Sequence, residues 1–467
     1  MSSQAELLYP FGFLLGEDLK RVPDHFRRVE FPIPLYVNSN THHAIRVASE
    51  ACCFLTGTVV HPEHPDFDLA QIADLLCMKP ESFQLEIDKL IGRFAFIMST
   101  PSETLIQTDA SGMRSIYFGR SQCETIVGSH ARLVARALGK VEYSSVAKSR
   151  KLGCPGMDTP FHGVQRLPPN IYLEMRSGVL RRFFPADQIQ SSNCVDSWAY
   201  AISQAQIAAR HFAARGNLAA SLTAGKDSRA SLLALRDVWG STGFFTYTRG
   251  VDSHDIDCAI AAQIAEKFSL QHRVINYADQ QRDEDLLSLI KKNSFGAHQH
   301  GLALAYYYDE QLKNCLHVRS NMLEITRSNL YFAAKKSGRF PHGLTNARHL
   351  ADYYALAGKL KRDEAQEISF HKYVEECELE SALEYMSSWD LFFIEHRMGA
   401  WRTGIIEESD LAFDTTNLFN SRETLSKFFG VPENERATSN ALMQLVNGEL
   451  PGMEKIAINP KKIAKLI

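Results

Sequence analysis

The sequence predicts an α/β protein with two domains, a β-rich domain over residues 1–190 and a doubly wound, parallel-sheet domain over residues 191–467. Three observations lead to this prediction. The chain has 467 residues, a length that suits two or three domains. Apolar segments before residue 190 are short and bounded by turn residues, as strands are. After residue 194, strand-like and helix-like segments alternate, which is typical of an open parallel sheet.

The elements of the first domain follow from its short apolar runs. One helix is indicated over residues 68–76, where apolar side chains recur at helical spacing. The remaining apolar runs predict strands at 51–60, 94–99, 104–108, 115–118, 125–128 and 171–175. Strands of this kind, separated by turns, favour an antiparallel β-rich domain.

The elements of the second domain begin with an Ala-rich amphipathic stretch over residues 195–215, which predicts a long helix. Apolar runs then predict strands at 217–222, 244–248, 272–275 and 316–319. Helical patterns between them lie at 228–236, 255–268, 281–291 and 302–312, and beyond residue 340 the pattern indicates helices only. In such a sheet, ligands bind beyond the carboxyl ends of the strands.

Composition excludes several classes of protein. The 51 basic and 54 acidic side chains give a formal net charge of −3, so no strong positive field attracts nucleic acid or an anionic membrane. No apolar run approaches the roughly 20 residues that span a bilayer. The first residues lack the pattern of a secretory signal, and the nine scattered cysteines include no Cys-x-x-Cys pair. We therefore expect a cytoplasmic protein with reduced thiols that binds neither nucleic acid nor a membrane.

The segment between the strand at 217–222 and the following helix is suited to bind phosphate. It reads Leu222-Thr223-Ala224-Gly225-Lys226-Asp227-Ser228. The small residues at positions 224 and 225 let backbone N–H groups approach an anion, and the two hydroxyl residues flank them. The helix N-terminus behind adds further donors and a partial positive charge. All seven residues are predicted to take part in this site.

Asp227 distinguishes this loop from the common P-loop, which has Ser or Thr after its Lys. A carboxylate inside a phosphate cradle is unfavourable unless a divalent cation lies between the two. Asp227 is therefore predicted to be a Mg²⁺ ligand facing a pyrophosphate group. The alternative is an ordinary strand–turn–helix junction in which Asp227 caps the helix.

Residues 223–228 resemble the Ser-Gly-Gly-x-Asp-Ser pyrophosphate loop of the asparagine synthetase superfamily, with Thr for the first Ser and Ala for the first Gly. Further segments resemble that superfamily in its expected order. They are 92–96 and 109–117, which resemble two central hairpin strands; 162–170 with 182–185, which resembles the close of the N-terminal domain; and 396–398, which resembles an Asp-Arg-Met helix.

The resemblance implies a degenerate glutamine-amidotransferase-like sandwich of the N-terminal-nucleophile type, followed by a pyrophosphate-loop ATPase domain. Members use ATP to adenylate a carboxylate, release pyrophosphate, and form an amide when an amine attacks. Their second acidic loop, Gly-x-Gly-x-Asp-Glu, corresponds here to residues 320–327, where both glycines and the Asp are absent. Glu324 is the acid that remains as a catalytic residue and metal ligand, or else it is a helix-start acid. Arg327 is expected to meet the departing pyrophosphate.

Two further sets of residues follow from the same resemblance. Tyr247 and Thr248 end the second strand, where adenine is expected to lie. Asp255 and Asp257 resemble the acidic start of the next helix, where capping is as good an interpretation as ligand contact.

Two departures limit the mechanism. Glutamine-using relatives begin with a cysteine after Met removal, whereas this chain begins Met1-Ser2, so glutaminase activity is not expected. Family enzymes also place a C-terminal lysine at amide formation. Lys461 is the candidate for that role, with Lys462 beside it, unless the basic tail is merely solvated.

Residues 395, 397, 401 and 402 recur at about one helical turn and share a face, in part. This face either binds a polar substrate or forms a salt-bridge seam between helices. The leading hypothesis for the protein is an ATP- and Mg²⁺-dependent ligase that joins a small-molecule or peptide carboxylate to a substrate amine or ammonia. The alternative is a non-catalytic nucleotide-binding or scaffold homologue. Partnership as a homodimer or with a protein of the same pathway stays open.

Overall fold

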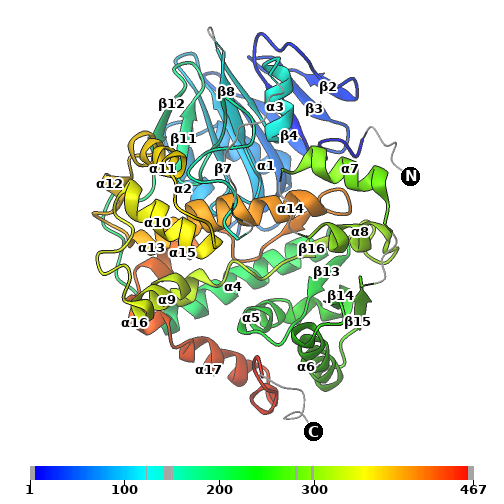
Figure 1. The fold of residues 1–467 in the computed structure, drawn as a ribbon. Helices are drawn as coiled ribbons and strands as arrows, with labels where there is room; N and C mark the ends of the chain where they lie inside the picture. Colours follow the sequence, from blue (N-terminus) through cyan, green and yellow to red (C-terminus); the bar gives the residue numbers. More distant parts are fainter. Residues whose placement is uncertain are drawn as a thin grey trace.

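The computed structural model describes residues 6–121, 124–140, 149, 151–278, 282–295 and 299–460. In this part of the chain, the strands form two six-stranded antiparallel sheets and one five-stranded parallel sheet. Figure 1 shows the antiparallel sheets together in the upper half of the molecule and the parallel sheet below them. The predicted α/β fold class is confirmed.

The first antiparallel sheet has the strand order β10-β8-β9-β1-β3-β2. Its strands are β1 (Phe13–Leu15), β2 (Phe26–Val29), β3 (Leu35–Asn38), β8 (Tyr117–Arg120), β9 (Thr125–Gly128) and β10 (Val164–Arg166). The prediction found β8 and β9 but none of the other four. Strands of three or four residues are too short to show a periodic signal, and pairing with neighbouring strands stabilises them.

The second antiparallel sheet has the order β12-β11-β7-β6-β5-β4. Its strands are β4 (His43–Val47), β5 (Cys52–Val60), β6 (Ile91–Ser99), β7 (Thr104–Thr108), β11 (Ile171–Glu174) and β12 (Val179–Arg182). The four inner strands are confirmed, whereas the polar, partly exposed edge strands β4 and β12 were not predicted. Phe13 and Leu35 of the first sheet share one buried core with Phe54 and Ile97 of the second.

Three helices accompany these sheets: α1 (Leu69–Cys77), α2 (Phe83–Lys89) and α3 (Ala131–Ala137). The predicted helix α1 is confirmed, and Asp68 and Gln71 form a capping box at its start. The seven-residue helices α2 and α3 were not predicted, because two turns show little helical periodicity.

The parallel sheet has the order β15-β14-β13-β16-β17. Its strands are β13 (Leu218–Ser221), β14 (Thr242–Thr248), β15 (His272–Asn276), β16 (Leu316–Val318) and β17 (Thr415–Thr416). The chain runs outward from β13 to β15 and then returns to add β16 on the other side of β13. The order therefore reverses between β13 and β16, and this reversal is the switch point at which doubly wound sheets bind ligands.

Strand β17 corrects the prediction that the chain beyond residue 340 is wholly helical. Its two residues pair with His317 and Val318 of β16. A two-residue strand carries no sequence signal of its own.

Helices surround the parallel sheet and connect it to the two antiparallel sheets, which share a buried core and which we call the sandwich (Figure 1). In the first half of this region they are α4 (Cys194–Ala213), α5 (Lys226–Ala234), η1 (Arg236–Ser241), α6 (Asp252–Phe268), α7 (Glu284–Asn293), α8 (His300–Tyr308), η2 (Ile325–Arg327) and α9 (Asn329–Ser337). The second half contains α10 (Ala347–Gly358), α11 (Glu364–Glu376), α12 (Leu379–Ala382), α13 (Ser388–Phe392), the π-helix η3 (Phe393–Arg402), α14 (Thr403–Ser409), α15 (Arg422–Phe429), α16 (Glu433–Arg436), α17 (Asn440–Glu449) and η4 (Met453–Lys455). None of the described helices is both long and apolar enough to cross a bilayer.

Buried ion pairs join the sandwich to the second half of the chain. Arg93 of β6 binds Asp410 through both guanidinium nitrogens at 2.5 and 2.6 Å, and it also reaches Asp414 at 3.0 Å. Arg182 of β12 binds Glu395 of η3 at 2.6 Å. We call this set of contacts the sandwich ion pairs.

Candidate functional site

A cavity of about 440 Å³ opens at the switch point between β13 and β16. Three segments supply most of its wall: the loop after β13 with the start of α5, the end of β14, and the loop after β16. The residues around it are Ser221, Thr223, Gly225, Lys226, Asp227, Ser228, Tyr247, Tyr306, His317, Arg319, Ser320, Asn321, Glu324, Arg327, Asn329, Ala437, Ser439 and Asn459. We call it the switch-point cavity.

The loop after β13 leads directly into α5 and is held by its own hydroxyl groups. The Ser228 hydroxyl donates to the Thr223 carbonyl at 2.9 Å, and the Gly225 N–H donates to the Thr223 hydroxyl at 3.3 Å. Gly225 is the N-cap and supplies no side-chain acceptor. The first N–H groups of a helix have no intrahelical acceptor, so those of α5 stay available to an anion at the cavity wall.

Asp257 of α6 supports the same loop from behind. Its carboxylate accepts a hydrogen bond from the Ala224 N–H at 2.8 Å. Asp255 accepts from the Thr248 hydroxyl at 3.2 Å. Neither acid caps α6, which begins at Asp252 after an N-cap at Val251 that offers no side-chain acceptor. The capping interpretation of these two acids is therefore wrong.

Asp227 and Arg327 form an ion pair inside the cavity. Both carboxylate oxygens of Asp227 contact the guanidinium, one of them at 3.2 Å from Arg327 Nη2. Burial raises the pKa of Asp227 above its ordinary value, the Arg327 guanidinium opposes this shift, and the nearby Glu324 carboxylate adds to it. Arg327 is thus directed at Asp227, and Glu324 lies close enough to influence the same carboxylate.

Cationic side chains outnumber carboxylates around the cavity, with Lys226, Arg319 and Arg327 facing Asp227 and Glu324. Burial, together with the neighbouring Arg327, lowers the pKa of Lys226. Burial also holds the pKa of His317 well below its ordinary value, so this imidazole is neutral. The cavity is therefore suited to a ligand that carries several negative charges.

Most of the predicted residues meet at this cavity. Eight of them line it: Thr223, Gly225, Lys226, Asp227, Ser228, Tyr247, Glu324 and Arg327. Leu222, Ala224 and Thr248 do not. Leu222 is 1% exposed and continues the strand by donating its N–H to Phe245, Ala224 is fully buried, and the Thr248 hydroxyl is bound to Asp255. The predicted Lys461, like the N-terminal Met1 and Ser2, lies outside the described residues.

Several cavity residues escaped prediction. Arg319 and Ser320 follow β16 directly, and polar residues after a buried strand are the signal that identifies them. Asn321 and Asn329 belong to the loop and helix that follow. Tyr306, Ser439 and Asn459 arrive from α8, α17's N-cap and the last described turn, and only tertiary packing brings these to the cavity.

The last described turn is bound to the back of α5. Arg229 donates to the carbonyls of Met453, Ile456 and Ala457, at 3.3, 3.2 and 2.6 Å. The Asn459 N–H donates to the Ala224 carbonyl at 3.2 Å. This segment therefore braces the loop that the cavity needs.

The polar face of the π-helix η3 divides between two roles. Glu395 is buried against Arg182, Asn170 and Tyr373, which makes it part of a salt-bridge seam. Arg397 lies over the Trp401 ring, 3.8 Å from its centroid. Arg402 is 2% exposed and close enough to Arg319 and Glu324 to feel both charges.

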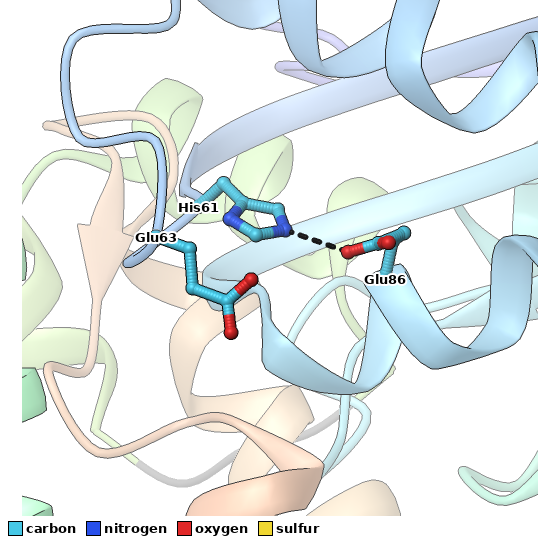
Figure 2. A group of neighbouring side chains, drawn as sticks. All are labelled: His61, Glu63 and Glu86. Carbon is cyan, nitrogen blue, oxygen red and sulfur yellow. Dashed lines mark hydrogen bonds and ion pairs between the residues drawn. The ribbon is translucent and has the colours of Figure 1, made fainter.

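A second cluster of titratable side chains lies at the end of β5, far along the sequence from the cavity residues. Figure 2 shows His61, Glu63 and Glu86 converging, with His61 Nε2 3.1 Å from Glu86 Oε2. Lys89 already binds both acids, at 2.8 Å to Glu63 and 3.2 Å to Glu86. Because an ammonium group neutralises the two carboxylates, this cluster is an ion-pair network.

Comparison with known proteins adds little on function. No protein-family model matches the chain, and a search of curated proteins finds no match. Similar solved structures include the allosteric regulatory enzyme of purine biosynthesis, at 11% identity and a TM-score of 0.25 over 51% of this chain. A second is glutamine phosphoribosylpyrophosphate amidotransferase from B. subtilis complexed with ADP and GMP, at 11% identity and a TM-score of 0.24 over 52% of this chain.

A third similar structure is glutamine-dependent NAD+ synthetase from Acinetobacter baumannii in complex with ADP, at 12% identity and a TM-score of 0.17 over 54% of this chain. The chain covers 62%, 60% and 49% of the lengths of these three structures, respectively. Similarities this low carry no argument about a ligand of the switch-point cavity. The ligand is therefore inferred from the residues of the cavity itself.

Proposed function

We propose that the protein is an ATP-using, AMP-forming ligase that activates a carboxylate and joins it to an amine. The observation that carries this proposal is the convergence, at one switch point, of the α5 N-terminus, Lys226, Asp227, Glu324 and two arginines. Such a set matches a triphosphate, whose negative charge requires both donors and cations. The resemblance of residues 223–228 to the pyrophosphate loop of asparagine synthetases supports the same assignment.

The residues divide the work according to their positions. The N–H groups of α5 and the Lys226 ammonium bind phosphate oxygens, while the hydroxyls of Thr223 and Ser228 keep the turn in shape. Tyr247, at the end of β14, borders the side where the nucleoside is expected. Binding the acid in the same cavity places its carboxylate next to the α-phosphate, and this proximity is itself a large part of the rate enhancement.

The carboxylates of Asp227 and Glu324 are the groups that would hold Mg²⁺, since oxygen donors on one cavity wall suit this ion. When bound there, Mg²⁺ supplies Lewis-acid stabilisation of the charge on the leaving pyrophosphate. Asp227 currently binds Arg327 through both oxygens, so a metal ion has to displace this guanidinium. The released Arg327 is then free to contact the pyrophosphate. In this proposal the amine comes from the substrate or from free ammonia.

Pyrophosphate release, screened over carboxylic acids and amines with ATP and Mg²⁺, tests this function. We expect Asp227→Ala to lower the release rate by at least about 100-fold. Asp237→Ala is the matched control, because Asp237 is an exposed acid paired with Arg210. Full activity of Asp227→Ala would refute the metal-ligand role.

A second candidate function is that of a nucleotide-binding scaffold without catalysis. The Asp227–Arg327 ion pair favours it, because the pair neutralises the carboxylate that the chemistry requires. This candidate predicts that ATP stabilises the protein equally with Mg²⁺ and with EDTA, and that Asp227→Ala leaves the thermal shift unchanged. The ligase predicts a larger shift with Mg²⁺ that Asp227→Ala removes.

A further inference from the structure

Polar side chains at the end of β16 are buried without partners. His317, Arg319 and Ser320 are 1%, 4% and 5% exposed, and all three line the switch-point cavity. Both ring nitrogens of His317, Arg319 Nη1 and the Ser320 hydroxyl lack a hydrogen-bond partner among the described residues. Buried polar groups are normally satisfied, so this concentration of unsatisfied groups at a cavity wall indicates a missing ligand.

Arg402 is not among the residues that line the cavity, but its guanidinium lies close enough to Arg319 for the two charges to interact. It comes from the π-helix η3, and its Nη1 also has no partner in the described part of the chain. Burial lowers the pKa of Arg402 well below its ordinary value, the nearby charge of Arg319 lowers it further, and the Glu324 carboxylate opposes this shift. Neither arginine is within ion-pair distance of a carboxylate from the residues that the structure describes. π-Helical turns are frequent at functional sites.

Other buried arginines of this protein are treated differently. Arg93 is paired with Asp410, Arg182 with Glu395, and Arg436 with Asp390, each at 2.5 or 2.6 Å. A buried guanidinium without a counter-charge or a hydrogen-bond acceptor is strongly unfavourable. Arg166 and Arg229 also lack a carboxylate partner, but they donate to backbone carbonyls. The described part of the chain shows no hydrogen bond from the side chain of Arg319 or Arg402, and an anion from outside the chain would supply the missing partner.

We propose that Arg319 and Arg402, assisted by Ser320, bind an anionic group of the acid substrate. The substrate is then an acid that carries a second carboxylate, or a phosphate, besides the carboxylate that is activated. This inference rests on the proposed ligase function, and it narrows the substrate class.

The position of the two arginines favours the acid over ATP. The donors suited to the triphosphate, Lys226 and the N-terminus of α5, follow β13, and the nucleoside side is marked by Tyr247 after β14. Arg319 follows β16, which lies on the opposite side of β13 from β14. An anion on Arg319 and Arg402 therefore lies away from the nucleoside, on the side left for the second substrate.

Calorimetric titration of the full chain without nucleotide tests the proposal, with succinate and inorganic phosphate as probes and butyrate as the single-carboxylate control. We expect succinate or phosphate to bind at least about tenfold more tightly than butyrate. Arg319→Gln and Arg402→Gln should each weaken that binding at least about tenfold and change the ATP affinity less than about twofold. Lys226→Gln should do the reverse. Arg210→Gln, an exposed control, should change neither.

The melting temperature of the unliganded Arg319→Met variant distinguishes a ligand-binding role from a structural one. A ligand-binding arginine should lower the melting temperature of the unliganded protein, whereas a structural arginine should raise it. Arg319→Met removes an unpaired buried charge, so we expect its melting temperature to rise above that of the wild type. The proposal is overturned if neither succinate nor phosphate binds, or if Arg319→Gln weakens ATP as much as it weakens the probe. It is also overturned if Arg319→Met melts at a lower temperature. If the wild-type protein bound succinate but not ATP, this would instead contradict the ligase function and leave the anion site intact.

Discussion

Single side chains decide how the switch-point cavity responds to charge. Asp227 is predicted to be a metal ligand, and in this structure its carboxylate contacts Arg327, which lines the same cavity. The guanidinium provides one positive charge where Mg²⁺ provides two. Exchange of one cation for the other is therefore the event that separates the unliganded protein from a catalytic one in the proposed function.

We predict that Arg327→Met strengthens the binding of Mg²⁺ by about tenfold, or about 1.4 kcal/mol, because the metal no longer competes with a guanidinium. Calorimetric titration of Mg²⁺ without nucleotide measures the effect. Arg236→Met, which breaks an exposed pair with Glu449, is the control and should leave the affinity unchanged. Equal affinities in all three proteins would show that Asp227 is not a metal ligand.

Glu407 of α14 gives a prediction about pH. Burial raises its pKa from the ordinary value of 4.5 to about 8, and the hydrogen bond from the Tyr117 hydroxyl, at 2.8 Å, opposes this only partly. The folded protein therefore keeps the acid neutral between pH 4.5 and 8, whereas the unfolded chain ionises it. Stability from this group is present below pH 4.5 and is lost as pH rises to 8, by up to about 1.4 kcal/mol per pH unit.

Glu407→Gln removes this titration. The difference in unfolding free energy between variant and wild type should move in favour of the variant from pH 5 to pH 8, and stay constant above pH 8. Urea denaturation at several pH values measures it. Parallel stability curves for the two proteins would contradict a raised pKa at Glu407.

At the scale of elements, length and burial decided what the sequence could reveal. The inner strands β5, β6 and β7, and the long helix α4, have enough apolar residues to show a period, and the prediction located them within a few residues. Edge strands such as β4 depend on a neighbour for their hydrogen bonds, and their side chains are mixed. No local pattern marks them, so only the assembled sheet defines them.

The residues of the candidate site also differ in how far the sequence alone could reveal them. Residues 223–228 are contiguous, so their chemistry was visible in the sequence, and the structure brings five of them to the cavity wall. Arg319 is the last residue of the strand predicted at 316–319 and the first residue after the observed β16, so it was within reach of the same reasoning. Arg402 lies more than 80 positions after Arg319, and Asn459 lies more than 200 positions after the loop that follows β13. No local sequence pattern predicts contacts between residues so far apart in the chain.

The close approach of the paired strands β5 and β6 gives a prediction about stability. Gly92 of β6 has φ +141°, and a Cβ there would lie 2.1 Å from the Thr58 carbonyl oxygen of β5. Gly92→Ala should therefore lower the unfolding free energy by about 2 kcal/mol or more, measured by urea denaturation. Gly448→Ala, in helix α17 with open space around it, is the control and should be neutral or slightly stabilising. Similar stabilities for the two variants would contradict the close approach of β5 and β6.

At the scale of the whole molecule, the sandwich ion pairs bind the antiparallel sheets to the part of the chain that holds the cavity. Arg93 and Asp410 are fully or almost fully buried, and Asp414 also binds Arg114 at 3.1 Å and the Thr58 hydroxyl at 2.6 Å. Two buried arginines of the sandwich, Arg93 and Arg114, therefore have their counter-charges in the second half of the chain.

We predict that Arg93→Met lowers the unfolding free energy by about 3–5 kcal/mol, because it leaves Asp410 buried without its partner. The loss should appear in one cooperative transition, measured both by tryptophan fluorescence and by far-ultraviolet circular dichroism. Arg210→Met, at an exposed pair, should cost less than about 1 kcal/mol. Two separate transitions in the wild-type protein would contradict a single cooperative unit.

Arg229 connects the last described turn to α5, because its guanidinium donates to carbonyl groups of that turn. Met453 and Ala457 stand 224 and 228 positions from Arg229, yet their carbonyls are its acceptors. Deleting the chain from Met453 onward would leave the buried Arg229 guanidinium without its acceptors. It would also remove the hydrogen bond from the Asn459 N–H to the Ala224 carbonyl. Such a truncation is therefore expected to disturb first the loop after β13, where the proposed nucleotide binds.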